Sequence, residues 1–519
     1  MSRDDPSALP PAPAPAPGAA ERHIARGTLV QQVATASGIV VMLAVVTVLG
    51  RSLTLSEFGL YGLSLSIASY VLFVQGSVEG AAVRAIAGAP DGAERAALFS
   101  TAIVVYTGLG LLAGLLVAVV GVGLTGVLGI PEDLRAEARE AFVVLGLLTA
   151  VGWPLKGCHD ALRATQRFGL AALGEVLAYI AFGVAMVLLL VIDAPLWALI
   201  GVGGAMPALI GLVCLFALVL AGVGPHLNVR LVDGARARDM LRVSTGLMIG
   251  GAADLFIYST DRVVLAAFRS AATVGLYEGA VRAHNLLRQV HGTLVLTVTP
   301  VTSGYLAAGD HERIRELLLR GTRYVLAVVV PGTVVLMVLA QPILEVWLGP
   351  KFRPAGLALA ILCSYWLIGA STGVAGSMLI AAGKISELAK YAWLVAISNL
   401  CLSLILTPIF GLEGVVLGTT IPYVLTFPIF LRIVLTTFPQ VSVGDLLREA
   451  WGPAYACALG LATGLLAVRL LADLDTVAEV AGAGTAGLAL YWVAYYAIWL
   501  RPNERVLVRS FLRRRVAAP

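Results

Sequence analysis

Five ionisable side chains interrupt an apolar stretch near the middle of the chain, between residues 273 and 300. They are Glu278, Arg282, His284, Arg288 and His291. A guanidinium group presents several N–H donors in one plane and binds carboxylate or phosphate oxygens in pairs, whereas a carboxylate favours cations and protons. The stretch therefore predicts a site for a charged ligand.

The spacing of these residues predicts two neighbouring polar faces on one helix. At about 100° per residue, one face lies within an arc of roughly 60°. It holds Glu278, Arg282, Asn285 and Gln289. A second strip on the adjacent flank holds His284, Arg288 and His291.

The composition predicts an all-α membrane protein that crosses the bilayer many times. Of the 519 residues, 59% are hydrophobic and only 13% are charged, which is too few charges to solvate a globule of this size. A span needs roughly 20 mostly apolar residues, and the chain has about fourteen such stretches. They are centred near residues 39, 67, 110, 148, 181, 209, 254, 287, 332, 369, 400, 425, 462 and 490. These runs are continuous rather than alternating, which favours helices over barrel strands.

The stretch centred near residue 254 carries a second polar stripe. It is formed by Asp254, Tyr258 and Asp261, with Arg262 beside it. A charge at mid-membrane costs about 2.5–3.5 kcal/mol on insertion scales, so such residues face water or charged partners rather than lipid. One interpretation is structural: Asp261 or Glu278 pairs with Arg282 and holds two helices together.

The other interpretation is an aqueous cavity for an anion. Arg262, Arg282 and Arg288, with the two histidines, cannot all be neutralised by three carboxylates if one carboxylate is engaged elsewhere. Spare cationic charge suits a phosphate or pyrophosphate. Asp254 and Glu175 are also candidates for coupling transport to protons or Na⁺.

The distribution of Lys and Arg predicts the orientation, because short cytoplasmic loops keep the excess of basic residues. With the N-terminus inside, most of the 36 Lys and Arg residues fall in the termini and inner loops. We therefore expect a multi-pass protein of the cell membrane with both termini in the cytoplasm. The net charge of +5 reflects this topology, with anionic-lipid contact by the tail, and does not indicate a nucleic-acid surface.

A weak internal repeat predicts two copies of a six-helix unit. SEFGLYGLSLS, with Gly59, matches ATVGLYEGAVR, with Gly275, at an offset of 216 positions. Near that offset, ATQRFG matches AAGKIS and PLWALIGVG matches GLEGVVLGT. An even number of helices per copy predicts parallel copies related by an axis along the membrane normal. Gly246, Gly250 and Gly251 offer a close-packing face and a hinge.

With the two bundles facing each other across a central cleft, the repeat and the two ends divide the chain into six parts. They are a disordered cytoplasmic arm rich in Pro and Ala (1–26), an N-terminal six-helix bundle (27–222), a cytoplasmic linker (223–241), a C-terminal six-helix bundle (242–437), two extra helices (438–500) and a basic cytoplasmic tail (501–519).

Enzyme, cofactor and metal chemistry find little support. The five cysteines are single and lack metal or redox spacing. No phosphate-binding GxxxxGK[ST] loop is present. A membrane glycan polymerase or ligase is the alternative from another class, but the longest outer loop, about residues 342–356, is thin for catalysis. An ion-coupled multidrug antiporter stays open, although it favours a cavity dominated by carboxylates.

Three segments resemble the Wzx-type polysaccharide flippases. They are LGRSLTLSEFGLYGLSLSIASYVLFVQGSVEGAAVRAIA, STDRVVLAAFRSAATVGLYEGAVR and PILEVWLGPKFRPAG. These flippases share a superfamily with the multidrug and toxic compound extruders and the MurJ-type lipid II flippases. The resemblance covers roughly residues 25 to 500, and its motifs identify the superfamily better than the substrate.

The resemblance implies two six-helix bundles around a V-shaped central cavity. It also implies a flippase that moves an undecaprenyl-pyrophosphate-linked oligosaccharide from the inner to the outer leaflet by alternating access, for cell-surface polysaccharide synthesis. It implies that Arg262, Arg282 and Arg288, with Arg51 at the outer end of the first helix, receive the pyrophosphate. Bilayer lipids and polysaccharide assembly proteins are the implied partners. Gln31 and Gln32 stand in the first helix after Arg26, with no basic residue at its middle, which weakens the case for a lipid II flippase.

Overall fold

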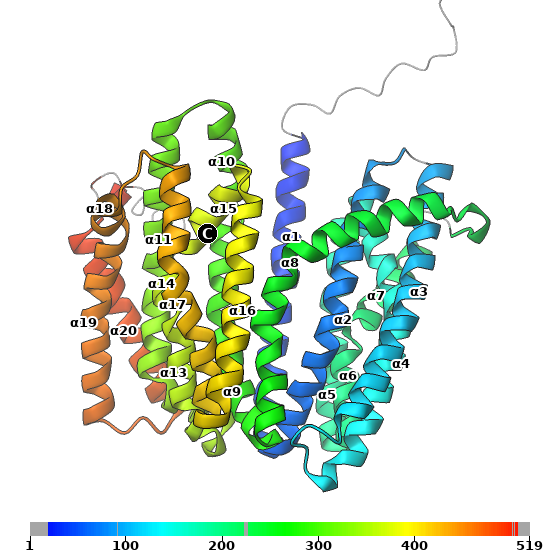
Figure 1. Cartoon of the computed structure of the whole chain (residues 1–519), viewed down its shortest axis with the longest axis horizontal. Coiled ribbons are helices and arrows are strands. Elements are labelled where there is room, and N and C mark those ends of the chain that lie inside the picture. Colours follow the sequence, from blue (N-terminus) through cyan, green and yellow to red (C-terminus); the bar gives the residue numbers. More distant parts are fainter. Residues whose placement is uncertain (1–18, 91, 223–226, 501, 503, 507–519) are drawn as a thin grey trace, which may run out of the picture.

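The structure is a computed structural model, and it describes residues 19–90, 92–222, 227–500, 502 and 504–506. In these ranges the regular elements are all helical (Figure 1). The first part of the chain forms α1 (Ala19–Ser52), α2 (Leu55–Gly88), α3 (Ala93–Leu124), α4 (Arg135–Ala164), α5 (Phe168–Val191), α6 (Leu196–Gly204) and α7 (Met206–Ala221). The predicted all-α membrane class is confirmed.

The second part of the chain has more helices, and several of them are short segments. It contains α8 (Gly234–Phe268), α9 (Ala271–Val295), α10 (Val298–Ala307), α11 (His311–Val338), α12 (Ala340–Leu348), α13 (Gly356–Ser364), α14 (Trp366–Gly369), α15 (Thr372–Ala381), α16 (Ile385–Phe410), α17 (Leu412–Thr437), α18 (Val443–Asp445), α19 (Gly452–Leu471) and α20 (Val477–Ile498). Short helices of other types are η1 (Glu132–Leu134), η2 (Val229–Leu231), η3 (Pro350–Ala355) and η4 (Leu446–Trp451).

Eleven helices of the described ranges are long and apolar enough to cross a membrane, and the number rises to 13 if two bent pairs each count as one span. Helix α9 is outside this set although it is 25 residues long. Every 18-residue window of α9 contains Glu278, Arg282 and Arg288, which exceeds the two charges that such a span tolerates. The predicted total of fourteen spans stays a prediction. Helix α9, the most polar of the predicted spans, carries the candidate site.

Two predicted boundaries are wrong. Helix α1 begins at Ala19, inside the arm predicted as disordered over 1–26, while residues 1–18 lie outside the described part. Helix α8 begins at Gly234, inside the predicted linker 223–241. The side chain of Asp233 accepts the backbone N–H of Ala235 at 2.9 Å and so satisfies one donor of the first turn. The linker is therefore shorter, and its last eight residues belong to the helix.

Helix α8 connects two groups of helices. In Figure 1, α2 to α7 lie on the right, the elements from α9 onward lie on the left, and α8 runs across the right-hand group before it turns down between the two. The turn is a 53° bend between Gly234–Ile249 and Gly251–Phe268. It falls at the glycines that the sequence predicted as a hinge, where the helix propensity is low. Helix α1 packs along α5 and also touches α12 of the other group.

The two groups meet where α2 crosses α9, at the glycines of the sequence repeat. A Cβ at Gly59 would collide with the carbonyl oxygen of Ala271, and a Cβ at Gly275 would collide with that of Leu55. Leu55 and Ala271 differ by the same 216 positions as Gly59 and Gly275. Each helix therefore contacts the other through equivalent residues, as an approximate two-fold axis requires. This reciprocity supports the predicted repeat.

Equivalent turns support the same axis. Gln166, before α5, has φ 58°, and Gly383, before α16, has φ 75°. These residues lie in ATQRFG and AAGKIS, the second pair of matching segments. Positive φ is uncommon outside glycine, so the shared left-handed turn is a specific likeness between the copies.

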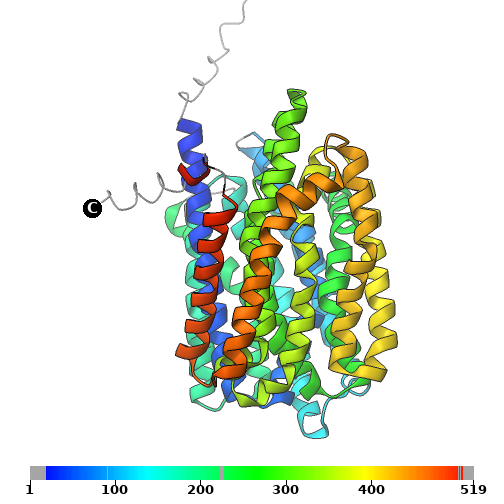
Figure 2. The same ribbon diagram turned by 90° about the vertical axis from the view of Figure 1, so that its left-hand side faces the viewer.

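Reciprocal loop contacts close the end of the bundle at which α8 and α9 join. The backbone of Gly129, after α3, donates to Ala266 at 2.8 Å and accepts from Ala271 at 2.9 Å. In the other direction, Arg51 at the end of α1 donates from Nη2 to the carbonyl oxygen of Val346 in α12 at 2.6 Å. Lys351 donates to the carbonyl oxygen of Leu53. Helix α1 begins and α20 ends at the opposite end of the bundle (Figure 2).

The glycine crossing predicts a position-specific cost of added volume. We expect Gly59→Ala to lower the stability of the detergent-solubilised protein by about 1–3 kcal/mol, because the new methyl group meets backbone that cannot move aside. Gly76→Ala on the same helix meets nothing within 4 Å and should be neutral or slightly stabilising. Thermal unfolding of both variants measures the difference, and equal melting temperatures would contradict the close crossing.

Candidate functional site

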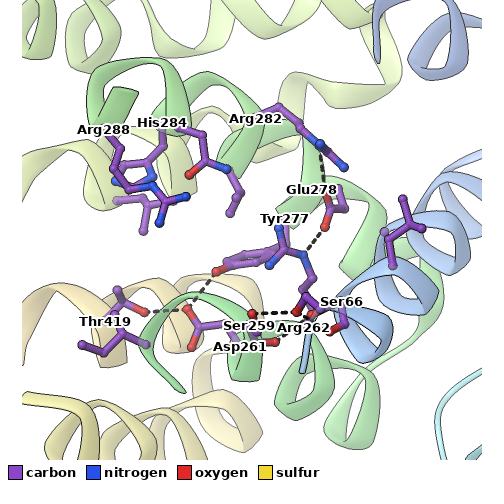
Figure 3. A pocket seen from close by; sticks show the side chains of 17 residues that line it. Ser66, Ser259, Asp261, Arg262, Tyr277, Glu278, Arg282, His284, Arg288 and Thr419 are labelled. Atoms are coloured by element: carbon purple, nitrogen blue, oxygen red, sulfur yellow. Dashed lines mark hydrogen bonds and ion pairs between the residues drawn. The ribbon is translucent and has the colours of Figure 1, made fainter. Parts of the chain in front are cut away.

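A cavity of about 250 Å³ lies beside the crossing of α2 and α9 (Figure 3). Helices α2, α8, α9, α13 and α17 supply its walls. The lining residues are Gly62, Leu65, Ser66, Ser69, Ile257, Ser259, Asp261, Arg262, Tyr277, Glu278, Val281, Arg282, His284, Asn285, Arg288, Leu362 and Thr419. The polar faces predicted for two separate helices therefore meet in one site.

The cavity lies on the approximate two-fold axis. Four lining residues of α2 and four of α9 form pairs that differ by 216 positions: Gly62 and Glu278, Leu65 and Val281, Ser66 and Arg282, and Ser69 and Asn285. The α2 members are small or apolar, whereas the α9 members carry the charges and the amide. The N-terminal group thus supplies space, and the C-terminal group supplies the ionic chemistry.

Glu278 is the centre of the ionic network. Its side chain is 1% exposed, and its two carboxylate oxygens accept from different guanidinium groups. Oε1 accepts from Nε of Arg262 on α8, and Oε2 accepts from Nε of Arg282, one turn further along α9, at 3.2 Å. Figure 3 shows Glu278 between these two arginines. The pairing considered from sequence is therefore present, and one carboxylate serves two cations.

Asp261 is held by neutral donors. Its Oδ2 accepts from the hydroxyl of Tyr277 at 2.8 Å and from the hydroxyl of Thr419 at 2.7 Å (Figure 3). Thr419 in turn accepts from the amide of Asn399 at 3.0 Å. These bonds join α8, α9, α16 and α17 and compensate for the burial of the carboxyl group.

Serine contacts tie the second half of α8 to α2. The hydroxyl of Ser66 donates to the carbonyl oxygen of Ser259 at 2.9 Å, and the hydroxyls of Ser69 and Ser259 are 3.0 Å apart. Tyr70 and Thr260 share a further hydrogen bond of 2.9 Å. Small hydroxyl residues let the helices approach closely and still satisfy their polar groups.

The lining contains three guanidinium groups and two carboxyl groups. His284 adds no acceptor for the arginines, because its Nε2 accepts from Nε1 of Trp366 at 2.9 Å. Arg288 is exposed at the edge of the site, while Asn285 adds amide donors beside it. The arrangement can receive the oxygens of an anion between α8 and α9.

The other residues named from sequence lie elsewhere. Arg51 is at the closed end, where Nε and Nη2 bond to backbone carbonyl oxygens of α12. Gln289 is exposed and outside the lining. The side chain of Asp254 lies outside the described residues. His291 packs on Trp366, with ring centroids 4.9 Å apart. Helical periodicity grouped residues along α9 but could not say where the wall of the cavity ends.

Glu175 belongs to a second polar network, in the N-terminal group. The ammonium of Lys156 on α4 lies 3.1 Å from a carboxylate oxygen of Glu79, 3.1 Å from one of Asp160 and 2.8 Å from Nδ1 of His159. His159 Nε2 is 2.8 Å from Glu175 of α5. Sequence reasoning found only Glu175, although the run WPLKGCHDALR places four ionisable residues inside an apolar helix and was a usable signal.

The second network has ligand types that suit a metal ion, but it already contains a cation. Glu79, His159 and Asp160 offer ligand atoms that all lie within 4.8 Å of one another. The Lys156 ammonium bonds to all three residues. Gln31 of α1 donates to Glu175 at 2.9 Å, and Tyr106 of α3 donates to Asp160 at 2.7 Å. The network therefore joins helices α1 to α5 by ion pairs and hydrogen bonds around the Lys156 ammonium.

The central place of Lys156 predicts a large loss on its removal. We expect Lys156→Met to destabilise the protein by up to about 3–5 kcal/mol. The Lys156 side chain is only 13% exposed, and its removal leaves the carboxylates of Glu79 and Asp160 without their shared cation. Lys384→Met is the matched control, since its pair with Glu387 is about 40% exposed and contributes about 0–1 kcal/mol. Thermal unfolding in detergent compares them, and equal shifts would refute the central role.

Comparisons with known proteins identify the family and the fold. Residues 48–356 match the family described as "Polysaccharide biosynthesis protein". The uncharacterized membrane protein EpsK of Bacillus subtilis (strain 168) is 20% identical over 395 residues, which are 75% of this chain and 77% of EpsK.

Two solved structures share the fold at low sequence identity. The lipid II flippase MurJ, in an inward closed conformation, superposes with a TM-score of 0.69 at 14% identity and covers 91% of this chain and 100% of its own. An inward-facing multidrug resistance MATE family transporter has a TM-score of 0.64 at 14% identity and covers 78% of this chain and 96% of its own. The chain therefore belongs to the polysaccharide biosynthesis protein family, and its fold is the one found in this flippase and this transporter.

Proposed function

We propose that the protein is a flippase for a lipid-linked oligosaccharide with a pyrophosphate headgroup, and that Arg262, Arg282 and Arg288 bind that headgroup. The observation that carries the proposal is a cavity on the axis between the two helix groups, lined by three guanidinium groups and two carboxyl groups. Guanidinium pairs match phosphate oxygens in both charge and geometry. Asn285 is in position to donate to the same oxygens.

The size of the cavity suits the pyrophosphate headgroup and not the whole substrate. At about 250 Å³ it is smaller than the ~300–1,000 Å³ pockets that enclose drug-sized ligands. A pyrophosphate fits such a space, whereas an oligosaccharide and an undecaprenyl chain do not. The sugar is therefore assigned to the aqueous side and the lipid tail to the bilayer beside the bundle.

Transport requires the two groups of helices to exchange their open and closed ends. The end closed by Arg51 and Lys351 is assigned to the outer face, and the end at which α1 begins and α20 ends is assigned to the cytoplasmic face of a cell-membrane protein. The 53° bend of α8 is a suitable joint, since this helix contacts both groups. Polysaccharide assembly proteins remain proposed partners.

An ion-coupled antiporter for cationic compounds is the second candidate. It is favoured by the carboxylates that the structure places inside the bundle, namely Asp261 in the cavity and Glu79, Asp160 and Glu175 in the second network. Coupling to protons or Na⁺ through Asp261 or Glu175 is also compatible with a flippase, so the nature of the cargo decides between the two functions.

The first prediction from this proposal concerns glycan export. We expect Arg282→Ala and Arg288→Ala, each expressed at normal levels, to reduce export at least about tenfold, because each removes about 1.4 kcal/mol or more of headgroup binding. Lys at either position should be partly tolerated, since it keeps the charge and loses the paired donors. Arg432→Ala, an exposed position on α17, is the control. Normal export by both alanine variants would refute the anion-binding role.

The second prediction concerns the class of ligand. Purified protein should bind farnesyl diphosphate, a short prenyl diphosphate used as a probe, and the affinity should fall as salt is added, since the contact is ionic. A cationic dye such as rhodamine 6G should bind weakly or not at all. Isothermal titration with both probes measures this preference. Tight binding of the dye without binding of the diphosphate would favour the antiporter.

A further inference from the structure

We propose that Glu278 is a built-in competitor of the substrate anion: its carboxylate occupies the guanidinium groups of Arg262 and Arg282 until the headgroup replaces it. This inference rests on the proposed function, because the anion that displaces Glu278 is the proposed pyrophosphate headgroup. It adds a role for a residue that a simple cation pocket does not need. The consequence is a site whose affinity for its anion is held below the value that its arginines alone would give.

The two-point contact resembles the binding of a phosphate. Each oxygen of Glu278 accepts from a different arginine, so the carboxylate bridges α8 and α9 in the way that two oxygens of one phosphoryl group would. A pyrophosphate carries more negative charge and more acceptor oxygens than a carboxylate. It can therefore take over both guanidinium groups and reach Arg288 and Asn285 in the same cavity.

Burial makes the carboxylate necessary in the absence of an anion. Glu278 is 1% exposed, and the side chains of Arg262 and Arg282 are 12% and 25% exposed. Cations with so little access to water are costly without a counter-charge. Glu278 supplies that charge from within the chain, so the empty site does not depend on a bound ion. The same interaction must then be broken when substrate arrives.

The opposite wall is built to accommodate Glu278. Its equivalent position on α2 is Gly62, and a Cβ at Gly62 would collide with Cγ, Cδ and Oε1 of Glu278. The carboxylate therefore lies against the backbone of the other helix group. Because Gly62 and Glu278 face each other across the axis, any relative motion of α2 and α9 changes the room that the side chain has. Displacement of the carboxylate by an anion is thus linked to the contact that must change during transport.

Other charged groups around Glu278 define what it can do after displacement. Asp261 is engaged by Tyr277 and Thr419, so it does not take over Glu278's place between the arginines. Ser66 and Ser69 make the α2 wall of the cavity polar, while their hydroxyl groups already donate to the backbone oxygens of Ser259 and Ser66. The displaced group therefore stays in a polar environment.

The test is the affinity of Glu278→Gln for an anion. Gln keeps the size of Glu and removes the charge, so the competition should disappear and farnesyl diphosphate should bind at least about tenfold more tightly than to the wild-type protein. Export by the same variant should be slower, because release becomes harder. A residue with only a structural role would give weaker binding after the same change. Glu140→Gln, at an exposed position on α4, controls for loss of one negative charge.

Two further variants keep the outcome decisive. Glu278→Asp is too short to bridge both arginines and should give a smaller gain than Gln. The gain from Glu278→Gln should shrink in the Arg282→Ala background, since one of the two guanidinium groups that Glu278 releases is then missing. Wild-type binding with unchanged or weaker binding by the folded Gln and Asp variants would overturn the competitor role alone. If neither the wild type nor any variant binds the diphosphate, the proposed function fails together with the inference.

Discussion

The close crossing of α2 and α9 is the contact on which the rest of the structure depends. Gly59 and Gly275 bring two backbones together through equivalent residues, so the axis of the repeat passes through this point. The same crossing sets the next turns of the two helices opposite each other. Small residues of α2 then face the charged residues of α9, and both line the central cavity together with residues of α8, α13 and α17.

The repeat is symmetrical in its backbone contacts and asymmetrical in its chemistry. Gly62, Ser66 and Ser69 carry no charge, while their counterparts on α9 include Glu278 and Arg282. The C-terminal helix group can therefore supply the residues that bind the ligand, while the N-terminal group forms the opposite wall of the cavity and moves relative to them. The N-terminal group keeps its own charges in a separate network around Lys156, where each carboxylate has a partner inside the bundle.

Much of the fold and part of the site could be predicted from sequence. The apolar stretches located the long helices, and the polar spacing on α9 placed Glu278, Arg282 and Asn285 on one wall of the cavity. The prediction failed for residues whose position relative to the cavity depends on contacts between distant segments. Gln289 shares the helical face but lies beyond the cavity, Arg51 is taken by backbone carbonyl oxygens of α12, and Lys156 was not recognised.

Composition and periodicity by themselves determined the membrane class and the polar faces, because both are properties of residue types at regular spacing along one chain. Matching segments indicated the repeat. Only the tertiary structure decided that one carboxylate serves arginines of two helices, and that Glu175 belongs with His159. Periodicity gives the angle of a side chain about its own helix. It does not give the depth or rotation of the neighbouring helix, and short-range ionic contacts depend on both.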